Sequence, residues 1–187
     1  YSKDKSLNGL NVVEATQRKR GTASLDDQVE LLLEIELNGG ASAVFHNMNE
    51  ADLRAFALHP NTMFASDSGV RKFGEGVPHP RGYGNNARVL GQYVREQKLL
   101  RLEDAIRRMT SLPAATFQIK NRGLIRAGAW ADLVVFEPAQ VTDRATFKEP
   151  HQYATGFKLV LVNGVPVIEA DHHTGARSGK VLRMNQP

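Results

Sequence analysis

Two short strand–helix repeats limit the fold of this chain more than any other feature of its 187 residues. The predicted strands are residues 42–46 and 61–66, and alternation of strands with helices indicates a parallel sheet. A closed (β/α)₈ barrel takes about 250 residues, and an open doubly wound sheet takes about six strands. Two strands complete neither architecture. We therefore expect part of a larger α/β enzyme, with a complete small α+β domain as the alternative.

Residue types at the ends of the helical segments support this organisation. Ser24 is expected to cap a helix over residues 24–38, and Asn49 is expected to cap a second helix that Pro60 ends. Further helices are expected over 85–97 and 100–117, and the last of them is expected to be interrupted at Pro113.

The pattern changes after residue 123, where the chain becomes rich in β-branched residues. Residues 131–138 and 157–170 are predicted to be strands, and the second run contains Asn163-Gly164, the strongest short signal for a hairpin. We therefore expect two parts, residues 1–115 with the strand–helix units and residues 116–187 as a small antiparallel β unit.

Composition excludes several classes of protein. The formal charge is +4, but Lys and Arg are spread along the chain. The one dense run, Arg18-Lys19-Arg20, is followed by a glycine and is expected in a solvated loop. Without a basic stripe, we expect no nucleic-acid partner. The chain has no cysteine for a disulfide or a thiolate metal site. No apolar run approaches the roughly 18 residues that span a bilayer, so we expect a cytoplasmic protein without a membrane partner.

A carboxylate and an arginine flank the glycine-rich loop that follows the second predicted strand. Asp67 lies in Ser-Asp-Ser-Gly, where the residues alone favour a turn that bonds its own backbone over a catalytic acid. Arg81 follows His79 and Pro80, and taken alone it is a solvated loop residue or a binder of carboxylates. His79 is either a pocket residue or a structural one.

Four segments carry a family resemblance that covers nearly all of the chain from residue 24 onward. They are SAVFHNMNEADLRAFALHPNTMFASDSG, PHPRGYGNNARVLGQYVRE, RRMTSLPAATFQIKNRGLIRAGAWADLVVFEP and DRATFKEPHQYATGFKLVLVNGVPVIEADHHTGARSGKVLR. Together they resemble the carboxy-terminal part of the N-acyl-D-amino-acid deacylases (D-aminoacylases) of the amidohydrolase superfamily. The resemblance implies the last part of a metal-dependent-hydrolase (β/α)₈ barrel plus the carboxy-terminal part of a small β-sandwich.

The resemblance also implies roles for three residues. Asp67 matches the catalytic aspartate that contacts a zinc-bound water, takes its proton and returns it to the leaving amine, and it is at most a weak metal ligand by itself. Arg81 matches the arginine that binds the α-carboxylate of the N-acyl-D-amino acid, and His79 is a further candidate for substrate binding. The implied cofactor of the full-length parent is zinc, and the implied partner is this small-molecule substrate.

The chain departs from the family pattern because the other zinc ligands are absent from it. It has no cysteine and no His-x-His pair, whereas catalytic zinc needs about three protein ligands, so we expect the isolated chain to be inactive. His46 is expected in the wall of the site and His172-His173 in a solvent-exposed turn. Two alternatives remain: an amidohydrolase of the dihydroorotase or hydantoinase type acting on cyclic amides, and a non-catalytic fragment that self-associates or pairs with a missing amino-terminal part.

Overall fold

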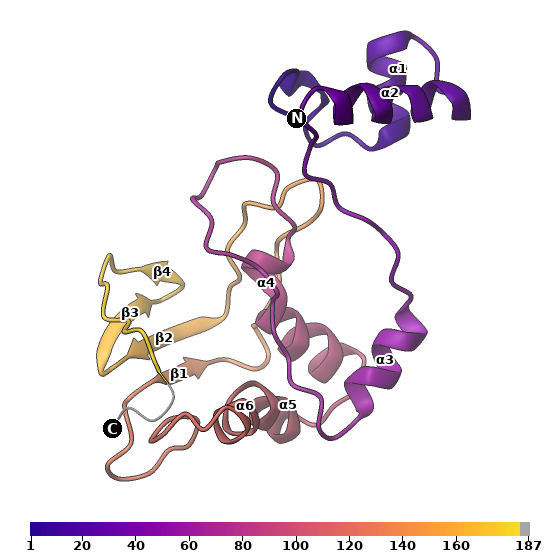
Figure 1. The fold of residues 1–187 in the computed structure, drawn as a ribbon. Helices are drawn as coiled ribbons and strands as arrows, with labels where there is room; N and C mark the ends of the chain where they lie inside the picture. Colours follow the sequence, from indigo (N-terminus) through magenta and orange to yellow (C-terminus); the bar gives the residue numbers. More distant parts are fainter. Residues whose placement is uncertain (184–187) are drawn as a thin grey trace. The chain divides into compact units, whose positions relative to one another are not determined.

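The computed structural model describes residues 1–183 and divides the chain into two compact units. The first unit contains Tyr1–Asn47 and Arg71–His79, and the second contains Met48–Val70 and the chain from Pro80 onward. The predicted division into residues 1–115 and 116–187 stays a prediction. The elements are η1 (Lys5–Leu7), α1 (Val12–Arg20), α2 (Leu25–Leu37), α3 (Glu50–Leu58), α4 (Arg81–Arg88), η2 (Val89–Glu96), α5 (Leu102–Met109), α6 (Ser111–Thr116), β1 (Leu133–Phe136), β2 (Phe157–Val162), β3 (Val165–Glu169) and β4 (His172–His173) (Figure 1).

The first unit is built around the helix pair α1 and α2, which enclose a small core at Leu31. The helix α1 was not predicted, and Arg20 lies in its last turn rather than in a solvated loop. Few apolar residues mark α1, so its stability depends on a capping box at Asn11 and on contacts with α2. Among these, Arg20 Nη1 pairs with Glu30 Oε2 at 2.7 Å. Tertiary contacts of this kind leave no periodicity in the sequence.

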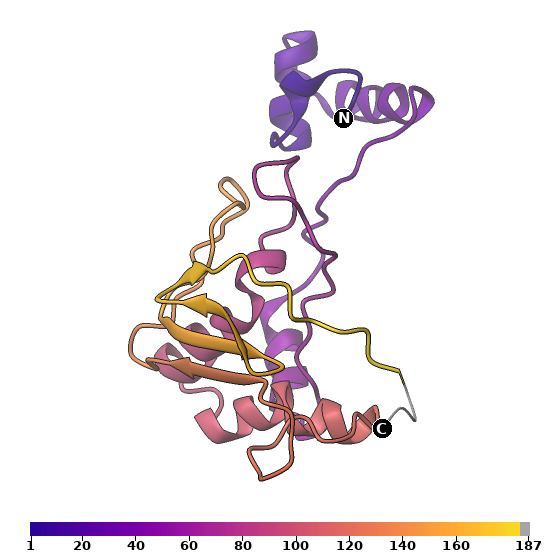
Figure 2. The ribbon, with the colours of Figure 1, turned by 90° about the vertical axis from the view of Figure 1, so that its left-hand side faces the viewer.

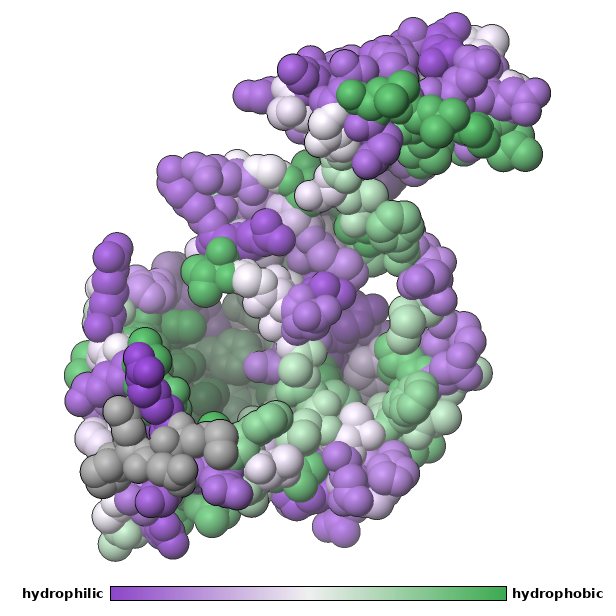
Figure 3. Space-filling view, viewed as in Figure 1, coloured by the Kyte–Doolittle hydropathy of each residue, from purple (hydrophilic) through white to green (hydrophobic). Residues whose placement is uncertain are grey.

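The helix α2 confirms the prediction for residues 24–38, including Ser24 as its cap. Much of its apolar surface is uncovered: Leu25, Leu33 and Leu37 are 74%, 59% and 87% exposed. Apolar side chains are visible on the surface of this helix pair in Figure 3. An amphipathic helix normally buries such a stripe.

The second unit has its core where α4, η2 and α5 pack against the sheet (Figures 1 and 2). Val141 is completely buried there, next to Leu90 of η2, and Phe136 and Phe157 contact the same cluster from β1 and β2. The four strands are antiparallel throughout, in the order β1-β2-β3-β4. Within residues 1–183, every helix is too short or too polar to cross a bilayer.

The two predicted barrel strands, residues 42–46 and 61–66, are wrong as strands in this chain. Both segments run without strand pairing, and the part of the chain that the structure describes contains no parallel strand pair. A strand needs a neighbour that accepts and donates its backbone hydrogen bonds. Here the Phe64 N–H donates to the carbonyl of Arg108 in α5, at 3.4 Å, instead of to a strand.

The helix boundaries agree with the predictions for α2 and α3 and differ after residue 80. The helix predicted at residue 85 begins at Arg81, and the last predicted helix breaks at Thr110 rather than at Pro113. Pro113 lies in the first turn of α6, where a backbone N–H has no partner within the helix and a proline is tolerated.

The predicted hairpin at Asn163-Gly164 is confirmed as the turn between β2 and β3. Both residues have positive φ, 51° and 82°, as this tight turn requires. The turn is tied to the chain before β1, because the Asn163 N–H donates to the carboxylate of Asp132 at 2.8 Å and Arg122 donates to the Asn163 side chain at 2.6 Å.

The buried arginine of α5 connects this helix to the end of α3. Arg108 is 3% exposed, and its guanidinium donates to the Ala57 carbonyl at the end of α3 and pairs with Asp104 one turn earlier, at 2.5 Å. This hydrogen bond lowers the pKa of Asp104 below its ordinary value of 3.8; burial opposes the shift, and a second bond from Arg107 supports it.

We expect this chain to lose stability in acid partly through Asp104. Because the pKa of Asp104 is lower in the folded state, its contribution is complete above pH 3.8 and is lost as the pH falls through the folded-state value. Urea unfolding at pH 6 and at pH 3 measures the loss, which we expect to be at most about 1 kcal/mol for this partly exposed pair. An Asp104→Asn variant with an unchanged dependence on pH would contradict this assignment.

Candidate active site

The backbone at Asp67 adopts a conformation that is uncommon for a side-chain-bearing residue. Its φ is +47°, in the left-handed region that Asp and Asn tolerate better than other residues. The next residue, Ser68, lies against α4 so closely that a Cβ at Gly82 would be 2.6 Å from the Ser68 hydroxyl oxygen. The segment around Asp67 therefore packs against the first turn of α4.

Arg81 is the first residue of α4, and its guanidinium reaches the Asp67 side chain. The distance from Arg81 Nη2 to Asp67 Oδ2 is 3.1 Å, with side-chain exposures of 42% and 92%. Pro80, at the helix cap, has φ −59°, which its ring favours and which suits the start of a helix. The structure thus brings together the two residues that the sequence singles out, although 14 positions separate them.

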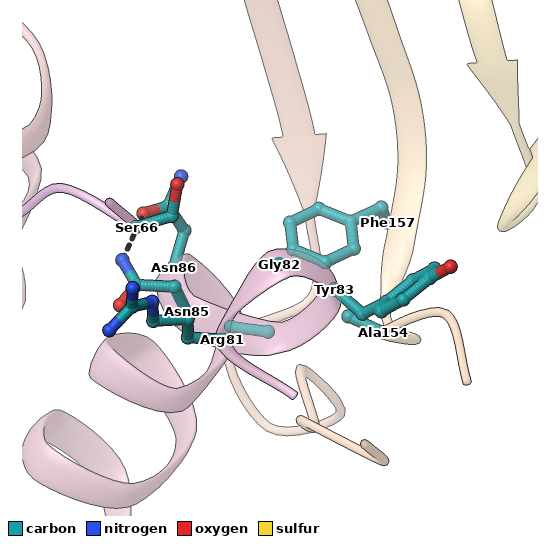
Figure 4. A pocket seen from close by; sticks show the side chains of 9 residues that line it. Ser66, Arg81, Gly82, Tyr83, Asn85, Asn86, Ala154 and Phe157 are labelled. Carbon is teal, nitrogen blue, oxygen red and sulfur yellow. Dashed lines mark hydrogen bonds between the residues drawn. The ribbon is translucent and has the colours of Figure 1, made fainter. Parts of the chain in front are cut away.

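A shallow cavity of about 200 Å³ lies beside this ion pair. Arg81 and Asn85, one helical turn apart, line it together with Ser66, which directly precedes Asp67. The amide of Asn85 donates to the Asn86 side chain at 3.1 Å, the bond drawn in Figure 4. The complete lining is Ser66, Arg81, Gly82, Tyr83, Asn85, Asn86, Ala87, Ala154 and Phe157.

Sequence reasoning missed the cavity residues that come from the β unit. Ala154 and Phe157 belong to the segment that leads into β2, and Tyr83 contacts the same segment through His151. The periodicity of α4 predicts that Asn85 lies on the same helix face as Arg81. No pattern in one sequence brings residues 154–157 next to residues 81–87.

The predicted histidines are distributed over both units. His79 belongs to the first unit and is half-buried, and its role in substrate binding stays a prediction. His46 is also in the first unit and exposed. His172 and His173 form β4 and are exposed, as predicted, but they lie in a strand rather than in a turn.

Candidate metal ligands are dispersed over the part of the chain that the structure describes. Within residues 1–183, no three His, Asp or Glu side chains gather as metal ligands, and the sequence has no cysteine. Asp67 is 92% exposed and pairs with Arg81.

Comparison with known proteins identifies the class. The family model described as "Amidohydrolase family" matches residues 14–168, and the chain therefore belongs to the amidohydrolase family. Among curated relatives from Alcaligenes xylosoxydans xylosoxydans, a D-aminoacylase is 43% identical over 76% of this chain and 29% of its own length. An N-acyl-D-aspartate deacylase is 44% identical over 76% of this chain and 28% of its own length.

Solved structures give the same grouping. A crystal structure of D-aminoacylase superposes with a TM-score of 0.72 at 38% identity, covering 88% of this chain and 32% of the other. A second match is the N-acyl-D-glutamate deacylase of Bordetella bronchiseptica, solved in complex with zinc and a phosphonate that mimics the tetrahedral intermediate. It superposes with a TM-score of 0.69 at 38% identity, covering 83% of this chain and 31% of the other. The chain thus has an amidohydrolase-type fold and spans less than a third of the length of these relatives.

Proposed function

We propose that this chain is one part of an N-acyl-D-amino-acid deacylase, which hydrolyses the amide bond to a carboxylate and a free D-amino acid. Membership of the amidohydrolase family and the deacylase relatives support this reaction class. The observation that carries the proposal is the 3.1 Å pairing of Arg81 with Asp67 at the edge of the cavity.

The substrate explains why such a pair is needed. In an N-acyl-amino acid the free carboxylate and the amide nitrogen are bonded to the same α-carbon, so the cation for the carboxylate and the acid–base group for the amide must be neighbours. Arg81 supplies the cation, because a guanidinium binds a carboxylate through two parallel hydrogen bonds. Ser66 and Asn85 offer further polar groups beside it.

Asp67 is proposed as the acid–base group. As water attacks the amide carbonyl, a C–O bond forms and the Asp67 carboxylate accepts the proton of the water. As the C–N bond breaks, the same group returns the proton to the leaving nitrogen. The left-handed backbone at Asp67 supports this role, since residues in such conformations occur often at functional sites.

The same proposal includes the architecture of the full-length protein and its metal. The uncovered apolar surface of α2 suits a chain that completes a (β/α)₈ barrel and a β-sandwich together with residues outside it, and so do the segments 42–46 and 61–66, which are not strands in this structure. Zinc is proposed for the full-length protein on the strength of the zinc-bound Bordetella relative. Because no group of three candidate ligands lies within residues 1–183, ligands beyond Asp67 are proposed to come from outside this range.

Replacing Arg81 in the full-length protein tests the proposal. We expect Arg81→Met to lower kcat/KM for N-acetyl-D-leucine roughly hundredfold, because the substrate carboxylate loses two charged hydrogen bonds. With N-acetylisopentylamine, which is N-acetyl-D-leucine without its carboxylate, the variant and the parent should have the same kcat/KM. Arg88→Met is the matched control, since Arg88 lies on the same helix and pairs with Asp143 at the same 3.1 Å.

Three results of this assay would contradict the proposal. One is faster hydrolysis of a cyclic ureide than of N-acetyl-D-leucine, as a dihydroorotase or hydantoinase would show. Another is an equal loss of kcat/KM in Arg81→Met for N-acetyl-D-leucine and for N-acetylisopentylamine. The third is hydrolysis by the 187-residue chain alone above a metal-only blank. Self-association of the chain stays a separate prediction. It is based on the uncovered apolar surface of the chain.

A further inference from the structure

The second residue of α4 is a glycine whose conformational freedom the helix does not use (Figure 4). The φ of Gly82 is not positive, so its backbone lies where a residue with a side chain can also lie. Glycine is a poorer helix former than alanine, because it loses more backbone entropy on folding. Space rather than conformation is therefore what distinguishes Gly82 from an alanine at this position.

The space beside Gly82 is occupied by Ser68. A Cβ on Gly82 would lie 2.6 Å from the Ser68 hydroxyl oxygen and 3.5 Å from the Ser68 Cβ. The first distance is too short for any pair of unbonded heavy atoms, whereas the second is an ordinary van der Waals contact. The close approach of the two segments therefore depends on the missing side chain of Gly82, and the hydroxyl is the group that an alanine would meet. Ser68 is half-buried, and its hydroxyl donates to the Gly69 carbonyl at 3.3 Å.

Ser68 is an anchor point of the segment that carries Asp67. Earlier in this segment, the Phe64 N–H donates to a backbone carbonyl of α5 at 3.4 Å. After Ser68 the chain is exposed at Gly69 and Val70. The side chain of Asp67 is itself 92% exposed, so its own burial does not fix the carboxylate. The place of the carboxylate depends instead on how the neighbouring residue packs.

We propose that Gly82 is a positioning residue for Asp67. Because residue 82 has no side chain, Ser68 packs directly on α4, and the adjacent Asp67 carboxylate is held 3.1 Å from Arg81 Nη2. This inference rests on the proposed function, because it assumes that the carboxylate transfers the proton. An alanine would force the hydroxyl to retreat from 2.6 Å to at least 3.4 Å. A misplacement of about 1 Å at a reacting group can lower a rate about a hundredfold.

Crystal structures of the full-length protein test the geometry without catalysis. In Gly82→Ala, we expect the distance from Arg81 Nη2 to Asp67 Oδ2 to exceed about 3.5 Å, so that the hydrogen bond is lost. In the double variant Gly82→Ala/Ser68→Ala the hydroxyl is absent, and the nearest side-chain atom of residue 68 is the Cβ, at 3.5 Å. The distance between Arg81 and Asp67 should then return to 3.1 Å.

Kinetics of the full-length protein test the consequence. We expect Gly82→Ala to lower kcat for N-acetyl-D-leucine about tenfold and to leave KM within about twofold, because Arg81 stays on the helix. Adding Ser68→Ala should restore kcat. The unfolding midpoint of Gly82→Ala should not fall, since alanine is the better helix former. Gly69→Ala is the matched control: the φ of this neighbouring glycine is not positive, and a Cβ there would have no atom within 4 Å, so kcat should be unchanged.

An Asp67→Asn background separates positioning from a general loss of structure. When the carboxylate is already absent, Gly82→Ala should lower kcat no further, because no proton-transfer group is left to misplace. A general loss of structure would lower kcat in both backgrounds and would contradict the inference.

An unchanged distance between Arg81 and Asp67 in Gly82→Ala, with the Ser68 hydroxyl rotated away from the new Cβ, would also overturn the inference. So would a loss of kcat that Ser68→Ala does not restore. Failure of the proposed function looks different. A full-length parent that does not hydrolyse N-acetyl-D-leucine would reject the reaction, while the distances in the crystal structures would still decide whether Gly82 positions Asp67.

Discussion

Asp67→Asn in the full-length protein is expected to lower kcat for N-acetyl-D-leucine about a thousandfold while KM changes little. The substitution removes the group that accepts and returns the proton, yet it keeps the shape of the side chain. Asn also tolerates the left-handed backbone, φ +47°, so the local backbone conformation should be preserved. Because the carboxylate is 92% exposed, the unfolding midpoint of the chain should not move.

Asp143→Asn is the matched control for this experiment. Asp143 also pairs with an arginine of α4, Arg88, at 3.1 Å, but its side chain is only 12% exposed, and it accepts a hydrogen bond from the Ala145 N–H. We expect this variant to lower stability and to leave kcat within about twofold of the parent, since it touches no reacting group. Equal losses of kcat for the two variants would show that Asp67 acts only through structure.

Gly156→Ala is expected to destabilise the chain by about 4 kcal/mol, the largest effect on stability that we foresee. Gly156 has φ +96°, and a Cβ on it would lie 2.6 Å from the backbone N and Cα of the fully buried Val141. Backbone atoms cannot rotate away as a side chain can, so the sheet and the segment after β1 must separate. Urea denaturation of the 187-residue chain measures the loss.

A second glycine isolates the cause of this loss. Gly175 has nearly the same φ, +87°, but a Cβ there would have no atom within 4 Å. Gly175→Ala should therefore cost only the strain of the left-handed conformation, about 1 kcal/mol. The difference between the two variants is the cost of the close approach to Val141. Equal losses for both would mean that conformational strain alone explains the effect.

Short-range features of the sequence were enough to predict the hairpin turn, the helix caps and the family. Ser24, Asn49 and the Asn163-Gly164 hairpin act through backbone bonds to near neighbours, so residue type alone predicted them. The two site residues followed from the resemblance, because Asp67 and Arg81 each stand in a short motif that can be read without a structure.

Only the tertiary structure decided the strands, the helix α1 and the wall of the cavity. Residues 61–66 have the composition of a strand, but pairing depends on a neighbouring strand, and Phe64 bonds α5 instead. The Arg81–Asp67 distance and the approach of Tyr83 to His151, 68 positions later, depend on how α4 packs against the sheet. The physical reason is that these contacts join segments far apart along the chain. A sequence records which side chains can interact, and the packing of distant segments selects which of them meet.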